Sequence, residues 1–313
     1  VASVGAGANE ADVTHEAAAA RATFGVDGTG VKACVLSDGV DSLADRQASG
    51  DLPVVDVLPG QAGDVGDDEG TAMLELIHDI APGADLGFAT GFSGVAQFAA
   101  NIVALEASGC DVIVDDITYF NEPSYQDGPI AQAVSEVRAL GSVYLTSAGN
   151  SGNLPDGTSG TWQGDFDDEF ASSGPLPAGR RVHGWGQTGV SYNTVARYST
   201  RTDLQWADPM GASGNDYDLY VLNPTGTQIV ASSTNIQDGD DDPLEAVGDT
   251  FAGEQILVVR DAGDADRYLS LYTNRGRLSV ATGGASRGHN ASVDAVSVAA
   301  TPAAVAASGG PTG

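Results

Sequence analysis

DDEGTAMLELIHDIAPGA, residues 67–84, predicts a helix that begins with acidic residues and ends at Ala-Pro-Gly. Acidic side chains are favoured in the first turn of a helix, because the helix dipole is positive there. Proline and glycine commonly follow the last turn. The stretch therefore places a carboxylate, that of Glu69, at the start of a helix.

On either side of this stretch, short apolar runs alternate with amphipathic segments from about residue 30 to residue 150. The runs are rich in Val, Ile and Leu, as a sheet covered on both faces requires. Between two of them, Val95, Phe98, Ile102 and Leu105 recur at helical spacing. The expected strands are 31–36, 54–58, 86–90, 112–117 and 143–147. This βαβ pattern predicts an α/β fold with a doubly wound parallel sheet, whose ligand site lies at the carboxyl ends of the strands.

Two further motifs fall at such strand ends. Ser37-Asp38-Gly39 follows the first expected strand as a small acidic turn, and Ala148-Gly149-Asn150 follows the fifth. Together with Glu69-Gly70-Thr71, these motifs resemble those of the subtilase superfamily. Ordinary subtilisins carry His-Gly-Thr at the helix start, and the related sedolisins place a Glu there as their general base. The resemblance implies a subtilisin-like fold and a serine peptidase that uses a carboxylate in place of the imidazole.

The resemblance also implies a role for each motif. Glu69 would be the general base, which favours acidic conditions because the reference pKa of Glu is about 4.3 against about 6.5 for His. Asp38 would hold or share a proton with Glu69, although it stands one residue later than in the usual Asp-Ser-Gly turn. Asn150 would donate a hydrogen bond to the oxyanion, where sedolisins carry Asp. Without the resemblance, Glu69 is an ordinary first-turn acid and Asn150 a turn-forming residue.

Two more acids, Asp115 and Asp116, end the fourth expected strand, whose continuation pairs with substrate backbone in subtilases. Asp116 is the better candidate by alignment and completes the predicted catalytic set. If one of them converges with Asp38 and Glu69, like-charge repulsion raises at least one pKa. The alternative is that they are strand-end acids that face solvent or cap loops.

The nucleophile is absent from its expected motif. Subtilases present it as Gly-Thr-Ser-x-Ala-x-Pro at the start of a long helix, whereas Ser159 and Ser286 are followed by segments that the sequence indicates as loops. The order of the motifs places the serine beyond Gly313, so the chain as given would be inactive on its own. The predicted function is a subtilase-like serine endopeptidase. The alternative is a non-catalytic subtilase-like protein that binds peptides or surface ligands.

The pattern of apolar residues changes after residue 152. Short runs such as 217–222 and 255–259 alternate with turn signals and lack helical periodicity, which predicts an antiparallel β-sandwich. Val296–Ala300 resembles a further strand of the parallel sheet, so the sandwich is expected to be an insertion. The expected boundaries are 1–24 for a lead-in, 25–155 for the first part of the α/β core, 156–282 for the inserted sandwich and 283–313 for the returning core.

The 313 residues carry a formal charge of −30, with the acids spread along the sequence and one lysine, Lys32. Nucleic acids and anionic membranes need basic surface, so neither is an expected partner. The resemblance implies a polypeptide substrate. The sequence has no apolar run long enough for a membrane span. An acidic surface fits a secreted or cell-surface protein, and it also fits a salty habitat. The sequence does not indicate an oligomeric state.

Cys34 lies in the first expected strand and Cys110 just before the fourth. Two cysteines are too few for a disulfide framework, so two buried free thiols are expected, neither of them catalytic. The acidic cluster 238–245 offers the oxygen ligands that calcium prefers but lacks the spacing of an EF-hand, so a solvated turn is the alternative. No other cofactor is expected.

Overall fold

The computed structural model describes residues 10–186 and 189–300, and the chain forms two compact units. Within the described residues, the first unit comprises 10–119, 127–148 and 288–300, and the second comprises 120–126 and the rest of 149–287. Both segments of the second unit start and end within the sequence span of the first unit. The second unit is therefore inserted into the first at two places, after residue 119 and after residue 148.

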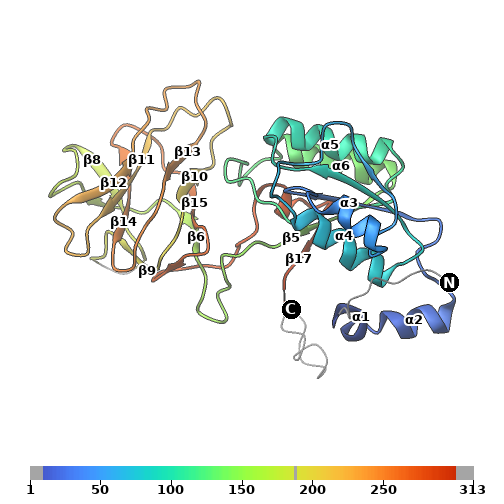
Figure 1. Ribbon diagram of the computed structural model, residues 1–313. Coiled ribbons are helices and arrows are strands. Elements are labelled where there is room, and N and C mark those ends of the chain that lie inside the picture. Colours follow the sequence, from blue (N-terminus) through green and yellow to red (C-terminus); the bar gives the residue numbers. More distant parts are fainter. Residues whose placement is uncertain (1–9, 187–188, 301–313) are drawn as a thin grey trace. The chain divides into compact units, whose positions relative to one another are not determined.

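The first unit is built on a parallel sheet of six strands in the order β17-β5-β4-β1-β3-β2. The strands are β1 (Lys32–Ser37), β2 (Val55–Val57), β3 (Asp85–Thr90), β4 (Val112–Asp115), β5 (Val143–Ser147) and β17 (Val296–Val298). The helices are α1 (Glu10–Thr14), α2 (Ala17–Phe24), α3 (Leu43–Ser49), α4 (Glu69–Ile80), α5 (Val95–Ala107), α6 (Pro129–Leu140) and the 3-10 helix η1 (Gly288–Ala291). Figure 1 labels the strands β5 and β17 of this sheet and the helices α3 to α6 of the same unit.

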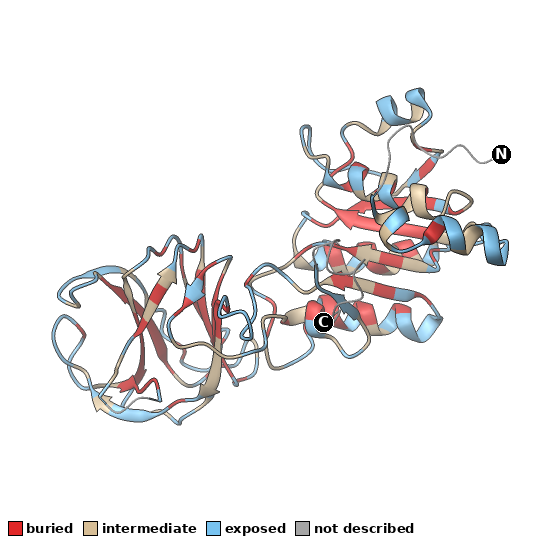
Figure 2. Cartoon of the chain, turned by 90° about the horizontal axis from the view of Figure 1, so that it is seen from below, coloured by how far each residue is buried: buried red, intermediate tan, exposed pale blue. Residues whose placement is uncertain are grey.

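Alternate residues of the strands build two cores, one on each face of the sheet. Leu36, Ile113 and Tyr144 are fully buried on the face that α5 and α6 cover. Val35 and Phe88 are fully buried on the other face, against Leu74 of α4. Figure 2 shows the buried residues concentrated on the strands and the exposed ones on the outer sides of the helices. The sheet is thus covered on both faces over β1 and β3, as a parallel sheet requires.

The face that carries α4 is less well covered at the other end of the sheet. Val296 lies beside Leu145 in the register of β17 and β5, and Val112 and Val114 lie beside Val143 and Leu145. Val143 is 38% exposed, and Val296 and Val298 of β17 are each 50% exposed. An apolar strip of this sheet therefore faces outward between β4 and β17.

The second unit is an antiparallel β structure. One sheet has four strands in the order β13-β10-β15-β6, and the other follows the path β12-β11-β14-β8-β7, with β9 paired to β14 and to β16. The strands are β6 (Thr161–Asp165), β7 (Asp168–Ala171), β8 (Arg180–His183), β9 (Asn193–Arg197), β10 (Thr202–Trp206), β11 (Tyr217–Leu222), β12 (Ile229–Ser233), β13 (Leu244–Val247), β14 (Gln255–Asp261), β15 (Tyr268–Thr273) and β16 (Arg277–Leu278). Inward residues of the sheets, among them Trp206, Leu219 and Val258, form one core. The expected fold class, an α/β parallel sheet with an inserted all-β domain, is confirmed.

The loop 120–126, which follows β4 in the sequence, belongs to the second unit, and Gln205 of that unit binds it. The Gln205 side chain is 2% exposed. Its Oε1 accepts hydrogen bonds from the backbone N–H and the hydroxyl of Ser124, at 2.8 and 2.7 Å. Its Nε2 donates to the carbonyl of Glu122 at 2.9 Å. The buried amide is fully satisfied by this loop, which therefore folds with the β unit.

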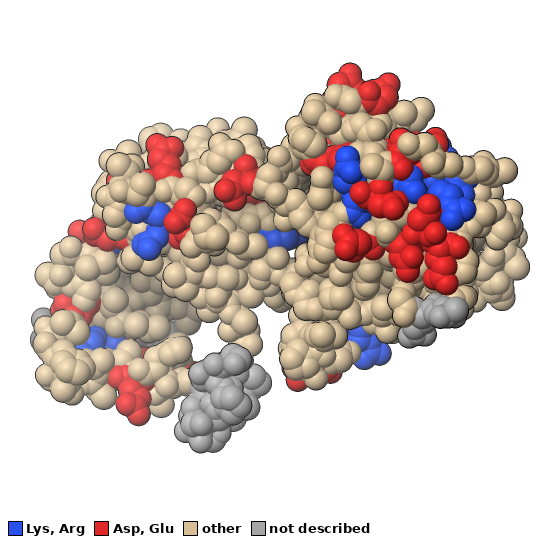
Figure 3. All heavy atoms as spheres, turned by 180° about the vertical axis from the view of Figure 1, so that it is seen from behind, with Lys and Arg blue, Asp and Glu red and all other residues tan. Residues whose placement is uncertain are grey.

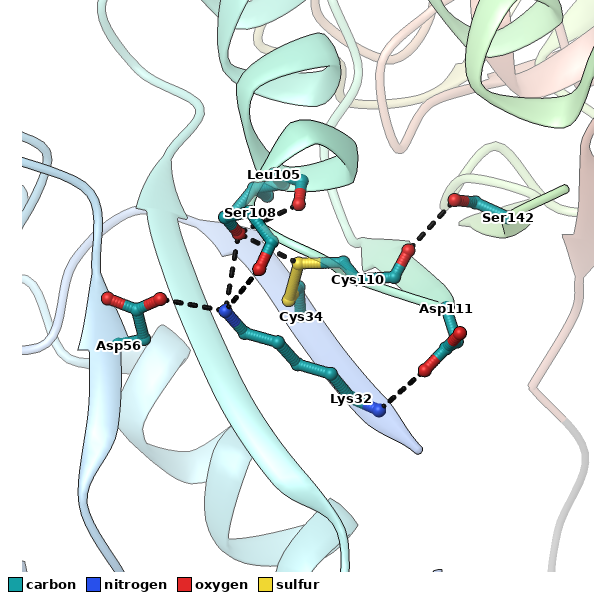
Figure 4. The surroundings of a disulfide bond; sticks show 8 residues. All are labelled: Lys32, Cys34, Asp56, Leu105, Ser108, Cys110, Asp111 and Ser142. Carbon is teal, nitrogen blue, oxygen red and sulfur yellow. Dashed lines mark hydrogen bonds and ion pairs between the residues drawn. A yellow bond between two sulfur atoms is a disulfide. The ribbon is translucent and has the colours of Figure 1, made fainter. Parts of the chain in front are cut away.

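The expectation of free thiols is wrong, because Cys34 and Cys110 form a disulfide (Figure 4). Cys34 lies on β1, and Cys110 comes just before β4, the strand that pairs with β1. Their Cα atoms are 5.9 Å apart although 76 residues separate them in sequence. The pairing depends on β1 and β4 being neighbours in the sheet, which the spacing of the cysteines does not reveal. Both residues are buried, as expected.

The surface carries both signs of charge. On the face drawn in Figure 3, acidic side chains lie in several places and are interspersed with Arg and Lys. Lys32, the one lysine, donates to Asp56 at 2.7 Å and to the carbonyl of Ser108 at 3.0 Å (Figure 4). No helix among the described residues is long and apolar enough to cross a membrane.

Candidate active site

Helix α4 begins at Glu69, and the residues around it hold this helix end in place. The carboxylate of Asp68, just before the helix, accepts hydrogen bonds from the backbone N–H of Ser42 at 2.8 Å and from the hydroxyl of Thr71 at 2.6 Å. Burial raises the pKa of Asp68, but these hydrogen bonds outweigh it and hold the pKa below its ordinary value. The helix therefore starts at a fixed point with an exposed Glu69 in its first turn.

Gly70 of the Glu-Gly-Thr motif is required by close packing. A Cβ atom at this position would lie 2.4 Å from the ring of Phe88 and 2.6 Å from the carbonyl oxygen of Gly39. Neither the buried ring nor the backbone can move aside at little cost. The absence of a side chain at Gly70 thus lets the start of α4 approach the turn that follows β1.

Asp38 lies in that turn and binds backbone groups on both sides of it. Its Oδ1 accepts hydrogen bonds from the N–H of Gly39 at 2.5 Å and from the N–H of Gly70 at 3.3 Å. Its carbonyl accepts a hydrogen bond from the Thr90 hydroxyl at 2.7 Å. Asp38 therefore joins the end of β1 to the first turn of α4 and to the end of β3.

A residue that the motifs did not single out contacts the predicted base. The hydroxyl of Ser37, the last residue of β1, donates a hydrogen bond to Oε2 of Glu69 at 3.2 Å. Ser37 is fully buried and Glu69 is exposed. Ser37 could have been identified by aligning Ser37-Asp38-Gly39 with the usual Asp-Ser-Gly turn, because Ser37 then occupies the position of the Asp.

The two acids at the end of β4 have opposite surroundings. Asp116 is exposed, whereas Asp115 is 2% exposed. Oδ1 of Asp115 accepts hydrogen bonds from the Thr146 hydroxyl at 2.9 Å and from the backbone N–H of Ile117 at 3.0 Å. Asp115 is a buried structural acid, and Asp116 is the one of the pair that solvent reaches.

A histidine that the sequence left without a role completes the surroundings of Asp115. Nε2 of His289 lies 3.3 Å from Oδ1 of Asp115, and both side chains are fully buried. The ring of His289 packs edge-on against Phe98 of α5, with centroids 5.4 Å apart. The neighbouring Asn290 donates to the Thr146 hydroxyl at 2.6 Å and to the Ile117 carbonyl at 3.1 Å. These contacts anchor η1, where the chain returns to the first unit, on β4 and β5.

The remaining predicted residues lie in the second unit. Asn150 is exposed near the start of the segment 149–287. Ser159 is 2% exposed, and its hydroxyl donates to the carbonyl of Thr282 at 2.8 Å. The segment after Ser159, which the sequence indicated as a loop, is strand β6. Ser286 precedes η1 in a segment without regular secondary structure. Ser159 thus has the surroundings of a structural serine.

The acidic cluster 238–245 brings three carboxylates together. Ligand atoms of Asp238, Asp240 and Asp241 all lie within 4.8 Å of one another, and the three residues are exposed. The hydrogen bond and the charge of Asp240 raise the pKa of Asp238. Calcium at this cluster stays a prediction.

Two buried groups of the second unit give the fold a testable pH dependence. Burial lowers the pKa of His183 from 6.5 to about 4, and Nδ1 of this ring accepts a hydrogen bond from the N–H of Asp167. Burial raises the pKa of Asp218 from 3.8 to about 6, against the opposing charge of Arg180. The unfolded chain binds a proton at His183 between pH 6.5 and 4 that the folded chain does not, so this group lowers stability as the pH falls. Asp218 does the reverse between pH 6 and 3.8.

As the pH falls, His183 lowers the free energy of unfolding by about 3 kcal/mol and Asp218 raises it by about the same amount, so the two contributions nearly cancel in the wild type. We therefore expect Asp218→Asn to be more stable than the wild type at pH 7, by about 2–3 kcal/mol, and to lose stability as the pH falls from 6.5 to 4. Urea unfolding followed by tryptophan fluorescence measures this, because Trp162, Trp185 and Trp206 all lie in the second unit. Equal slopes against pH for the two proteins would contradict the assignment.

Comparison with known proteins gives distant structural matches. No family model matches the chain, and no curated protein sequence matches it significantly. The CspB protease of Clostridium perfringens is 10% identical over 89% of this chain and 70% of that protein, with a TM-score of 0.44. The prenylagaramide maturation protease PagA is 15% identical over 39% of this chain and 46% of that one, with a TM-score of 0.31. The S41 psychrophilic protease is 20% identical over 41% and 48%, with a TM-score of 0.26.

All three of these proteins are proteases. The matches to the last two proteins cover about half of the length of each.

Proposed function

We propose that the protein is a serine peptidase of the subtilase type, with polypeptide substrates, in which Glu69 is the general base. One observation carries the proposal. An exposed carboxylate stands at the start of a helix, at the carboxyl edge of a parallel sheet, and a buried hydroxyl holds one of its oxygens. The carboxyl edge is where open parallel sheets bind ligands. A fixed, solvent-accessible carboxylate can accept a proton there.

In the proposed reaction, a serine hydroxyl transfers its proton to the Glu69 carboxylate as its oxygen attacks the carbonyl of the scissile peptide bond. The amide of Asn150 is proposed to donate a hydrogen bond to the oxyanion. Glu69 then gives the proton to the leaving amine, and water hydrolyses the acyl-enzyme by the same route in reverse. Asp38 is proposed to support the base by fixing the start of α4. Asp116, the solvent-accessible acid at the end of β4, is proposed to complete the catalytic set at the same edge of the sheet.

The nucleophile is proposed to lie on a segment that follows β17. Ser159 is buried and donates to a backbone carbonyl, so a substrate carbonyl does not reach it. The outward apolar strip around Leu145, Val296 and Val298 supports this proposal. Parallel sheets are buried on both faces, so a helix on this strip would complete the fold. The subtilase resemblance implies a nucleophile at the start of such a helix, which is why we propose it there.

We also propose that the protein is secreted or displayed on the cell surface. The disulfide between Cys34 and Cys110 supports this, because disulfides persist in oxidising environments and are rare in the reducing cytosol of mesophiles. The strongly acidic composition is compatible with the same location.

Labelling with a fluorophosphonate tests the proposed function. The longest natural polypeptide would be treated across acidic to neutral pH and the adduct mapped by mass spectrometry. We expect an adduct on a serine that follows residue 313 in that polypeptide. An adduct on Ser159 or Ser286 would overturn the placement of the nucleophile. A folded protein without any adduct would favour the other candidate function, a non-catalytic peptide-binding protein.

A further inference from the structure

We infer that the Ser37 hydroxyl is the group that orients the Glu69 carboxylate, at the position where the resemblance predicts an aspartate. Ser37 would be a positioning residue, since it acts on the base and not on the substrate. Its catalytic meaning rests on the proposed function. The contact itself is a property of this chain and can be tested without any hydrolysis.

The backbone of Ser37 is fixed from several sides. Ser37 lies opposite Thr90 in the register of β1 and β3, and its carbonyl accepts a hydrogen bond from the N–H of Gly91 at 2.8 Å. The residue is fully buried, at the end of a central strand. The Ser37 hydroxyl therefore has a fixed origin from which to donate to Oε2 of Glu69 at 3.2 Å. A donor of this kind restricts the carboxylate at little cost in entropy.

The helix that carries Glu69 is fixed as well, and here Asp38 has its own task. Asp38 accepts hydrogen bonds from the N–H groups of Gly39 and Gly70. It thereby ties the first turn of α4 to the turn after β1. The two neighbours thus divide the work, since Asp38 sets the position of the helix end and Ser37 sets the orientation of the side chain.

A hydroxyl differs chemically from a carboxylate at this place. A second carboxylate beside Glu69 would repel its charge and raise its pKa, so that the base would be protonated at mildly acidic pH. A hydroxyl donor instead stabilises the ionised form and lowers the pKa of the carboxyl that it binds. The Ser37 hydrogen bond therefore favours the ionised form of Glu69, the form that can accept a proton.

Other charges near the helix bear on the same titration. Acidic groups gather at the start of α4, while arginines contact its outer side and its far end, where Arg46 pairs with Glu75 and Arg21 donates to the carbonyl of Ile80. The charged groups are Asp38, Asp67, Asp68, Arg46, Glu75 and Arg21. A substitution of Ser37 leaves all of these groups in place, so a change in the titration of Glu69 reports the lost hydroxyl.

The test is a titration of the Glu side chains by NMR, with 13C at the carboxyl carbon, on the 313-residue chain. The signal of Glu69 is assigned as the one lost in Glu69→Gln. In Ser37→Ala we expect the pKa of Glu69 to rise by about 0.5–1 pH units, because the ionised form loses a hydrogen bond. Glu75, on the same helix, should titrate as in the wild type. Ser37→Thr keeps a hydroxyl and should leave the titration of Glu69 unchanged.

If Ser37→Ala does not fold, Ser37→Cys replaces it, since a thiol is a weak donor and should shift the titration in the same direction. An unchanged pKa of Glu69 in the folded variant would overturn the inference and make Ser37 a structural serine. In the longest natural polypeptide, the acid limb of kcat/KM against pH should move with the titration. A shift in the titration without a shift in that limb would keep the contact but remove Glu69 as the base. Failure of the inference and failure of the proposed function are thus distinguishable.

Discussion

Replacing Glu69 by Gln is expected to reduce peptide hydrolysis by the longest natural polypeptide about 10²–10⁴-fold. The amide has nearly the shape of the carboxylate and can still accept the Ser37 hydrogen bond, but it cannot take a proton from the nucleophile. Substrate contacts are unaltered, so the loss should fall on kcat more than on KM. Initial rates on a fluorogenic peptide at several substrate concentrations measure both constants.

The matched control is Glu75→Gln, on the same helix. Both changes remove one negative charge from α4, but Glu75 pairs with Arg46 at 3.5 Å and lies away from the helix start. Loss of an acid from the first turn costs about 0.3–1 kcal/mol of helix stability, so Glu69→Gln should remain folded. Hydrolysis retained by Glu69→Gln would show that Glu69 is only a first-turn acid.

Much of the first unit follows from its sequence. The apolar run Val143–Ser147 is strand β5 with the expected bounds, and α4 begins at Glu69. The other expected strands differ from β1 to β4 by no more than two residues at either end. Strands of a parallel sheet are buried on both faces, so their sequences are continuously apolar and stand out. Turn residues and helix starts then indicate where each strand begins and ends.

Several strands of the second unit could not be predicted, because they lack that signal. Strand β7 reads DEFA and β8 reads RRVH, with charged residues that pair across the strands. Arg181 of β8 bonds to Asp168 of β7, and Arg260 of β14 reaches the same carboxylate at 3.2 Å. Arg260 is buried, whereas Arg181 and Asp168 are partly exposed, and the two arginines pair with the same carboxylate. A pattern based on alternating apolar residues does not detect such strands.

The candidate site shows a different limit. The motifs located Asp38 and Glu69, but the residue at the end of β1 that binds Glu69 is Ser37. Neighbouring residues of a strand point to opposite sides, and the sequence does not tell which of them faces the helix. The disulfide and the pair of Asp115 with His289 depend on which strands and returning segments are neighbours. Contacts between residues far apart in the sequence depend on strand order, and local sequence patterns do not predict strand order.

The second large effect concerns the buried ion pair of the second unit. The Arg287 side chain is 3% exposed and that of Asp203 is fully buried, and the guanidinium binds both carboxylate oxygens. The guanidinium also lies 4.1 Å from the ring centroid of Tyr272. Replacing Asp203 by Ala would leave the charge of Arg287 in a dry site without its partner. We expect a loss of about 3–5 kcal/mol in the free energy of unfolding of this unit.

Urea unfolding followed by tryptophan fluorescence measures that loss, since every tryptophan of the chain reports on the second unit. The matched control is Arg181→Ala, which opens a partly exposed pair with Asp168 and should cost less than about 1 kcal/mol. The double variant Asp203→Leu/Arg287→Met removes both charges and should recover part of the stability, because the penalty comes from leaving one charge unpaired. If the double variant were less stable than Asp203→Ala, the pair itself, and not the lone arginine, would account for the loss.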